Sequence, residues 1–395
     1  MPRKKLNKEL WGENPFEKIG IRHPLFFAMK KLIVKIFVIS SLLYGSNNYY
    51  FYNPQIDNGS EKFFHPINTI LNGSYDILRN GSVKSKDITD IPYRKSSETI
   101  WFNITHPIEN INKFGVNKFI ELEIFNLSFD PKKGQFLPNI ANHILGNGML
   151  YVKMEEWYHY RKFQHPRLLS IGTTTFYQIM NELVEHRSVP IDGQRYVLVD
   201  SISDLLIFNP LGIILFSFDN VKKFFSKTLP IQDWSLQPIY DPLTFKLENT
   251  GQNYIMHFPM LGTEQIQPFV YWGIHGLAGM TYKMKSNQYL SIGVGRVVNR
   301  IRSEIRETDY LEKIIFFTPD MDGTASIFLS KNNSLLMSAM VTGPRFYNAQ
   351  INIYPGIIKI GRFSPGFYCA FGESEGLVLG LSFDKLPFGL GGQFQ

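Results

Sequence analysis

Two patterns of apolar positions divide the chain. Between residues 138 and 218, apolar side chains recur at the i, i+3, i+4 spacing that places them on one face of a helix. Beyond about Trp234 this spacing fades, and short runs alternate between apolar and polar or small residues, with Gly, Pro, Asn or Asp between the runs. This order predicts an α+β protein: a helical middle region followed by an antiparallel β-sheet or a small barrel of about eight to ten strands.

Three helices are predicted in the middle region. The first runs from Pro138 to Phe163, and its glycines Gly146 and Gly148 each cost about 1 kcal/mol relative to Ala, which a helix tolerates best where a neighbouring helix approaches closely. The second runs from about Pro166 to His186. The third covers residues 197–218, and Pro210 within it predicts a break or a kink. Its apolar part is short for a membrane span.

The alternating runs have two unlike faces. In the run from Val270 to Tyr282, one face carries mostly apolar residues and the other carries mainly small and polar ones such as His275, Gly279 and Thr281. A transmembrane strand turns its apolar face outward to lipid, whereas a soluble barrel that binds a lipid or another apolar ligand turns that face inward. Alternation alone leaves both arrangements open. The chain ends FGLGGQFQ, a partial match to the terminal aromatic residue of outer-membrane strands.

The N-terminal part carries a targeting signal. The first 36 residues hold nine basic and three acidic residues, and Met29-Lys30-Lys31 is followed by the apolar run Leu32–Leu43 and by small residues at Gly45 and Ser46. A basic start, a short apolar core and small residues predict a signal peptide, because about 12 apolar residues cannot cross a bilayer. An amphipathic surface helix is the alternative. The predicted divisions are residues 1–46, this signal; 47–130, an irregular linker; 131–230, the helical domain; and 235–395, the β domain.

Composition excludes several classes of protein. Of the 395 residues, 44% are hydrophobic and 19% charged, which excludes a largely disordered chain. The single cysteine, Cys369, excludes an internal disulfide framework and thiolate-rich metal sites. No pattern typical of nucleic-acid binding accompanies the net charge of +7, so we expect no nucleic-acid partner. We predict neither a metal nor another cofactor.

Titratable residues gather on the predicted helices. The candidate catalytic residues are His143 on the first helix, Glu182 and Glu185 on the second, and Asp200 and Asp204 on the third. Imidazole and carboxylate groups supply general acid–base chemistry if the helices bundle. The alternative is a buried polar network in which these groups satisfy one another. No HExxH motif or nucleophile elbow favours a particular reaction.

The helical region resembles a family of uncharacterised Gram-negative envelope proteins that is known only by a domain-of-unknown-function label. The resemblance covers about 75 residues, in HILGNGMLYVKMEEWYHYR, NELVEH and DSISDLLIFNPLG, and it departs from the family at Ile144, where the family has Pro. A more distant similarity is to VanZ-like membrane proteins. The positions that carry the resemblance are His143, Gly146, Asn147, Arg161, Glu182, Glu185, Asp204, Asn209, Pro210 and Gly212.

The resemblance and the alternation together favour an exported envelope protein. We expect it at the outer membrane, with membrane lipid as its partner and a structural, transport-like or lipid-binding role; the alternative location is the periplasm. The alternative function is a hydrolase-like enzyme that acts on an envelope lipid or glycan through the His143 and carboxylate site. A VanZ-like inner-membrane protein is a third hypothesis.

Overall fold

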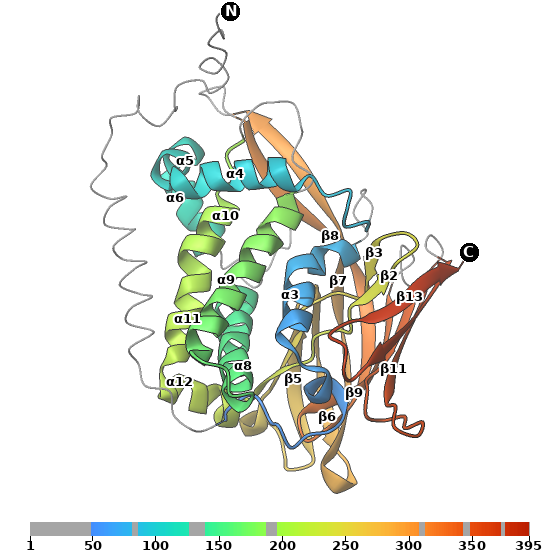
Figure 1. Cartoon of the computed structure of the whole chain (residues 1–395). Helices are drawn as coiled ribbons and strands as arrows, with labels where there is room; N and C mark the ends of the chain where they lie inside the picture. Colours follow the sequence, from blue (N-terminus) through green and yellow to red (C-terminus); the bar gives the residue numbers. More distant parts are fainter. Residues whose placement is uncertain are drawn as a thin grey trace, which may run out of the picture. The chain divides into compact units, whose positions relative to one another are not determined.

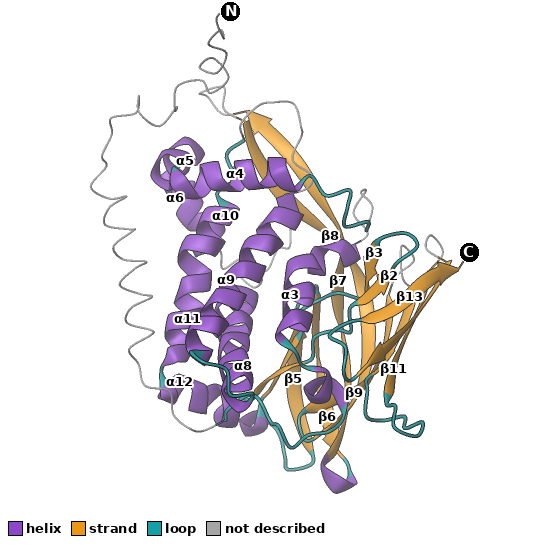
Figure 2. Cartoon of the chain, in the orientation of Figure 1, coloured by secondary structure: helices purple, strands orange, loops and turns teal. Residues whose placement is uncertain are grey.

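The computed structural model describes residues 49–80, 86–125, 139–186, 196–307, 313–342, 348–372 and 376–394. The chain divides into two compact units, Met1–Tyr44 and Gly45–Gln395, and the account below concerns the second. The predicted signal peptide lies outside the described residues. The described part combines helices with a mostly antiparallel sheet, so the predicted α+β class is confirmed (Figures 1 and 2).

The helical elements of the described residues come in two groups, one before and one within the predicted helical domain. The first group is α2 (Gly59–Phe63), α3 (Pro66–Tyr75), η1 (Asp76–Asn80), α4 (Tyr93–Thr105), α5 (Pro107–Phe114), α6 (Val116–Phe119) and the π-helical η2 (Ile120–Ile124). The second group is the π-helical η3 (Asn139–Gly146), α8 (Asn147–Tyr160), α9 (Pro166–Glu185), α10 (Asp200–Ser203), the π-helical η5 (Asp204–Phe208), α11 (Asn209–Ser217), α12 (Asp219–Lys223) and the π-helical η6 (Phe224–Thr228).

The first group corrects the expectation of an irregular linker at residues 47–130. These helices have 4 to 13 residues, too few for a sustained apolar period, and several begin with signals that have only local meaning. At α3, His65 accepts a hydrogen bond from the Ile67 backbone N–H at 3.1 Å, and Pro66 occupies the first turn. Tertiary packing, chiefly of α3 against α9, stabilises what the local pattern does not reveal.

The second group confirms the three predicted helices. η3 and α8 form one continuous helix, α9 matches the second, and α10, η5 and α11 form the third. Pro210 does not break the third helix, because the π turn of η5 directly precedes it and residues 208 and 209 keep helical dihedral angles. The expected break is therefore wrong: the helix absorbs the missing N–H of Pro210 in a widened turn.

A single sheet of thirteen strands runs through the described residues, in the spatial order β1-β4-β5-β6-β7-β8-β9-β10-β11-β12-β13-β2-β3. All adjacent strands pair antiparallel except β13 with β2. The strands are β1 (Ile231–Asp233), β2 (Ile239–Asp241), β3 (Lys246–Glu248), β4 (Tyr254–His257), β5 (Ile266–Trp272), β6 (His275–Lys283), β7 (Gln288–Glu307), β8 (Lys313–Lys331), β9 (Ser334–Thr342), β10 (Ala349–Ile353), β11 (Pro365–Gly372), β12 (Gly376–Phe383) and β13 (Gly389–Phe394). Two short 3-10 turns, η7 (Pro259–Leu261) and η8 (Lys285–Asn287), connect strands.

The sheet confirms one of the two predicted β architectures and rejects the other. It is not closed into a barrel, since β1 and β3 stand at opposite ends of the strand order. The run Val270–Tyr282 is a hairpin of β5 and β6 rather than one strand, and a two-residue turn keeps its apolar positions on one face. Residues 357–363 form no strand and hold only the isolated bridge between Ile360 and Phe363.

The two faces of the sheet have opposite polarity and opposite exposure. Alternate positions of β5–β13 form what we call the exposed sheet face. Val270 and Trp272 on this face are half-buried against the helical core. Twelve of its large side chains are 42–65% exposed: Ile266, Met280, Tyr282, Ile292, Val294, Ile327, Val341, Ile351, Phe371, Leu381, Leu390 and Phe394. The opposite face is buried although many of its side chains are polar: His275, Thr281, Ser291, Ser326, Ser330, Ser338, Gln350, Asn352 and Ser382. A water-soluble sheet packs its apolar face inward, so this arrangement is inverted.

Elements from the rest of the chain cover the buried face. Phe63 of α2 packs with Trp234, Tyr271 and Phe328 in one apolar cluster, and the Leu335 backbone N–H donates to the Ser60 hydroxyl at 3.1 Å. Across β6 and β7, the Thr281 and Ser291 hydroxyls pair at 2.8 Å. Hydrogen bonding of this kind offsets the cost of burying a polar sheet face.

Candidate functional site

Four carboxylates lie buried together where helices of both groups meet. We call Glu123 of η2, Glu182 of α9, Asp200 of α10 and Asp204 of η5 the acidic cluster; each is at most 7% exposed. Glu185, one turn after Glu182, is half-buried and belongs to the same electrostatic environment. Three of the four residues were predicted. Glu123 was not, because it falls in the segment expected to be irregular.

His143 connects this cluster to a line of polar side chains. Its Nε2 lies 3.3 Å from Asp204 Oδ2, and its Nδ1 lies 2.9 Å from Asn209 Oδ1. Asn147 donates to the same Asn209 oxygen at 3.2 Å and accepts from the Tyr177 hydroxyl at 3.0 Å. Predicted residues of the first and third helices thus form one hydrogen-bonded line, which Tyr177 of α9, a residue that was not predicted, extends to the second helix.

Burial shifts the pKa values of the titratable groups in the acidic cluster and of His143. Desolvation raises the pKa of Asp204 and of Glu182 well above the ordinary value, and the neighbouring carboxylates raise both further. Desolvation raises the pKa of Asp200 to about 6 and lowers the pKa of His143 to about 4. Near neutral pH His143 is therefore uncharged, and burial favours the protonated form of Asp204.

The uncharged state also fits the hydrogen-bond directions. The Asn209 carbonyl oxygen only accepts, so His143 donates from Nδ1–H and leaves a lone pair on Nε2. The protonated carboxyl of Asp204 then donates to that nitrogen. The pair holds one mobile proton between an acid and a base in a buried place, which is the arrangement required for proton transfer and also for a neutral structural link.

The glycines of the motif bring the helices into contact. A Cβ atom on Gly148 would lie 2.4 Å from the Phe216 ring and 2.9 Å from the Gly212 carbonyl oxygen. A Cβ on Gly212 would lie 2.6 Å from the His143 carbonyl oxygen, and one on Gly146 would meet the Tyr254 ring at 2.4 Å. The predicted close approach of a neighbouring helix at Gly148 is confirmed, and its partner is α11.

Two predicted residues have other roles. Arg161 ends α8, is exposed, and lies over the Trp157 ring at 5.4 Å. Pro210 lies in the first turn of α11 and has no polar side chain to offer the cluster. Among the described residues, no group of three or more His, Cys, Asp or Glu side chains has an arrangement that would hold a metal ion.

A second buried charge group lies where α8 meets the sheet, and sequence reasoning missed it. Lys153 Nζ lies 2.5 Å from Glu61 Oε1 and 3.1 Å from Asp233 Oδ2, and Lys153 is 1% exposed. Burial alone would lower the pKa of Lys153, but Asp233 and Glu61 outweigh it and raise the pKa. The three residues are far apart in the sequence and share no spacing, so no sequence signal marks them.

The carboxylate of Glu156, one turn after Lys153, binds the backbone of residues 50–52. It accepts hydrogen bonds from the backbone N–H groups of Tyr50, Phe51 and Tyr52 at 2.6, 2.9 and 2.8 Å. Burial raises the pKa of Glu156 to about 7, although these three donors oppose the shift. The acid therefore titrates near neutral pH.

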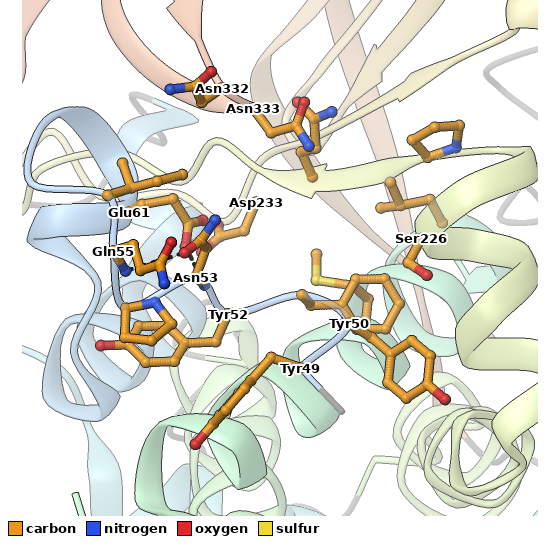
Figure 3. A pocket seen from close by; sticks show the side chains of 17 residues that line it. Tyr49, Tyr50, Tyr52, Asn53, Gln55, Glu61, Ser226, Asp233, Asn332 and Asn333 are labelled. Atoms are coloured by element: carbon orange, nitrogen blue, oxygen red, sulfur yellow. Dashed lines mark hydrogen bonds between the residues drawn. The ribbon is translucent and has the colours of Figure 1, made fainter. Parts of the chain in front are cut away.

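A cavity of about 430 Å³ lies beside this segment (Figure 3). Its lining includes Tyr49, Tyr50, Tyr52, Glu61, Asp233, Asn332 and Asn333. None of the candidate catalytic residues lines it. The acidic cluster and this cavity are therefore separate places in the fold.

Among the residues that the structure describes, one helix passes a length and composition test for a membrane span. It covers Asp200–Ser217, with a mean hydropathy of 1.3, and 61% of it is buried inside the protein. A core helix passes the same test, so this finding is weak support for a span. Comparison with protein-family models, with curated proteins and with solved structures finds no match for the chain. The resemblance to envelope proteins therefore remains a prediction.

Proposed function

We propose that this protein is an exported envelope protein that associates with the outer membrane through the exposed sheet face, with a structural, transport-like or lipid-binding role. The observation that carries the proposal is the inverted sheet: large apolar side chains of β5–β13 face outward, while the buried face carries many polar side chains among its apolar ones. Large continuous apolar surfaces on proteins mark sites of contact with lipid or with other proteins. Lipid is the partner that the alternation of a membrane strand predicts.

Polar residues bound the apolar band on β7. The exposed sheet face carries Leu290, Ile292 and Val294 between Gln288 and Arg296. Leu290 to Val294 span four residue steps, about 13 Å along the strand, and the flanking polar residues lie about 26 Å apart. Outer-membrane proteins present an apolar band of about 25 Å to lipid, so the apolar band of β7 falls within that height.

The edges of the sheet also suit an apolar environment. An open sheet edge in lipid leaves backbone groups without partners, which is costly. Here the two edge strands, β1 and β3, are short and covered. Ile231 of β1 belongs to the buried core, and the Leu247 backbone N–H of β3 donates to the Lys86 carbonyl oxygen at 3.3 Å. At β1 and β3, the face of the sheet rather than its edge is therefore left to meet lipid.

The test compares one substitution inside the band with a matched one outside it. Val294 on β7 is 65% exposed, and Val116 on α6 is 47% exposed. We expect Val294→Arg to reduce membrane recovery strongly, because an Arg near the middle of an outer-membrane band costs about 2–4 kcal/mol. Val116→Arg should leave recovery unchanged. The measurement is fractionation into inner membrane, outer membrane and periplasm, with N-terminal sequencing of the mature form. A wild-type protein found only as a soluble periplasmic product would overturn the proposal.

The enzyme alternative rests on the contact between His143 and Asp204. A His and a carboxylate 3.3 Å apart can exchange a proton during catalysis. The side chain of His143 is 16% exposed and that of Asp204 is 4% exposed, which leaves little access for a substrate. We therefore place this function second, and the His143→Ala variant described below distinguishes the two.

A further inference from the structure

Five connections of the sheet lie at the same end of it. Because β4 to β13 pair antiparallel in chain order, every second connection falls at one end. We call this the loop end. It comprises the connections β4–β5 (258–265), β6–β7 (284–287), β8–β9 (332–333), β10–β11 (354–364) and β12–β13 (384–388), together with the adjoining strand residues.

Basic residues outnumber acidic ones at the loop end. The basic residues, all exposed except the half-buried Lys331, are Lys283, Lys285, Lys331, Lys359, Arg362 and Lys385. Two carboxylates share this end: Glu264 is exposed, and Asp384 is paired with Lys62 of α2 at 3.1 Å. The β4–β5 connection has no basic residue, and each of the other four connections has at least one in it or beside it. Adjacent strands are about 4.8 Å apart, so these four connections place a cation about every 10 Å along this end.

Apolar side chains stand beside these cations. Met260 and Leu261 of the β4–β5 connection are 63% and 70% exposed, and Ile360 and Phe363 of the β10–β11 connection are 64% and 69% exposed. Phe363 is next to Arg362, and Ile360 is next to Lys359. Side chains of this kind at the tip of a loop cost free energy in water and gain it in the acyl region of a membrane.

We propose that the loop end binds the anionic phosphate headgroups of membrane lipids, with its apolar tips inserted beside them. The inference rests on the proposed membrane association and adds the class of lipid that the protein selects. Lysine and arginine stems lie along apolar surface while their charged ends reach the headgroup level. A row of cations at the end of an apolar face matches an anionic membrane surface, to which each basic residue adds about 1 kcal/mol, or about fivefold in affinity.

The experiment measures flotation of the purified full chain with two kinds of vesicle, pure phosphatidylcholine and an equal mixture of phosphatidylcholine and phosphatidylglycerol. The test variant is Lys359→Gln/Arg362→Gln. The control is Arg94→Gln/Lys118→Gln, which removes the same charge from exposed positions on α4 and α6. We expect the test variant to bind the mixed vesicles about 25-fold more weakly than wild type does. Its binding to pure phosphatidylcholine vesicles should be unchanged. The control variant should bind both kinds of vesicle as wild type does.

The outcomes separate this inference from the proposed function. If the wild type binds both kinds of vesicle equally, the membrane proposal stands and the headgroup inference is overturned. The headgroup inference is also overturned if the control variant loses as much affinity for the mixed vesicles as the test variant. Failure of the wild type to bind either vesicle overturns both. Competition by soluble glycerophosphate at the concentration of lipid phosphate would show a site for free phosphate instead, which also overturns the inference. Weaker binding of the mixed vesicles at high salt is the further result expected of an electrostatic contact.

Discussion

Replacing Lys153 by Met tests the energetics of the buried charge group. Lys153 of α8 bridges Glu61 of α2 and Asp233 of β1, at 2.5 and 3.1 Å, and its ammonium lies 4.4 Å from the centre of the Phe64 ring. All three charged residues are at most 9% exposed. Met keeps most of the apolar stem and removes the charge, so the variant isolates the ionic part of the contact.

The expected loss of folding stability follows from the two carboxylates that remain buried when Lys153 is removed. Without Lys153, the carboxylates of Glu61 and Asp233 stay buried beside each other with no cation between them, and breaking a buried pair in this way costs about 3–5 kcal/mol. The pKa of Glu61 is already raised by its burial, and loss of Lys153 would raise it further, so Glu61 takes up a proton in the variant. Protonation limits the loss but cannot restore the lost attraction.

A triple variant serves as the control. Lys153→Met/Glu61→Gln/Asp233→Asn leaves no charge in this group. The amide oxygen that Asp233→Asn introduces can still accept the hydrogen bond that the Ser235 hydroxyl donates at 2.6 Å to the present carboxylate. We expect the triple variant to recover most of the lost stability, because a neutral group of similar volume replaces a buried ion pair at small cost. The assay is urea unfolding in detergent, followed by the fluorescence of the buried Trp234. A loss below about 1 kcal/mol for Lys153→Met, the size of a surface ion pair, would refute the reasoning. So would a triple variant as unstable as the single one.

Two further predictions concern titratable groups. The pKa of Glu156 is raised by burial to about 7, so its contribution to stability is complete below about pH 4.5 and is lost as the pH rises through 7, a difference of about 3 kcal/mol. Between pH 5 and pH 8, the free energy of unfolding measured in urea titrations should therefore fall less for Glu156→Gln than for wild type. An equal fall in both proteins would contradict the raised pKa of Glu156. His143→Ala leaves Asp204 and Asn209 without their shared partner and should lower the free energy of unfolding by about 1–3 kcal/mol if the line of polar residues is structural. Unchanged stability together with loss of hydrolysis of an envelope lipid or glycan would instead favour the enzyme.

Local sequence patterns were sufficient to predict the helices that carry most of the site. The apolar spacing predicted the three helices that carry His143, Glu182 and Asp204, and helix geometry depends mainly on residues three and four positions apart. The glycine at position 148 predicted a close neighbour for the same local reason. Glu123 was missed because its helix is short and depends on packing, which no window of the sequence contains.

The alternation of residues beyond Trp234 determined that the sheet has one apolar and one polar face, because successive side chains of a strand point to opposite sides. It could not determine which face meets the protein, since a two-residue period is the same in both arrangements. Only the tertiary structure decided this, by packing α2 and its neighbours onto the face that carries the buried polar residues and leaving most of the other face, including Val294, exposed. The parallel pairing of β13 with β2 and the grouping of Lys153 with Glu61 and Asp233 are likewise tertiary, because each joins residues 80 or more positions apart in the sequence.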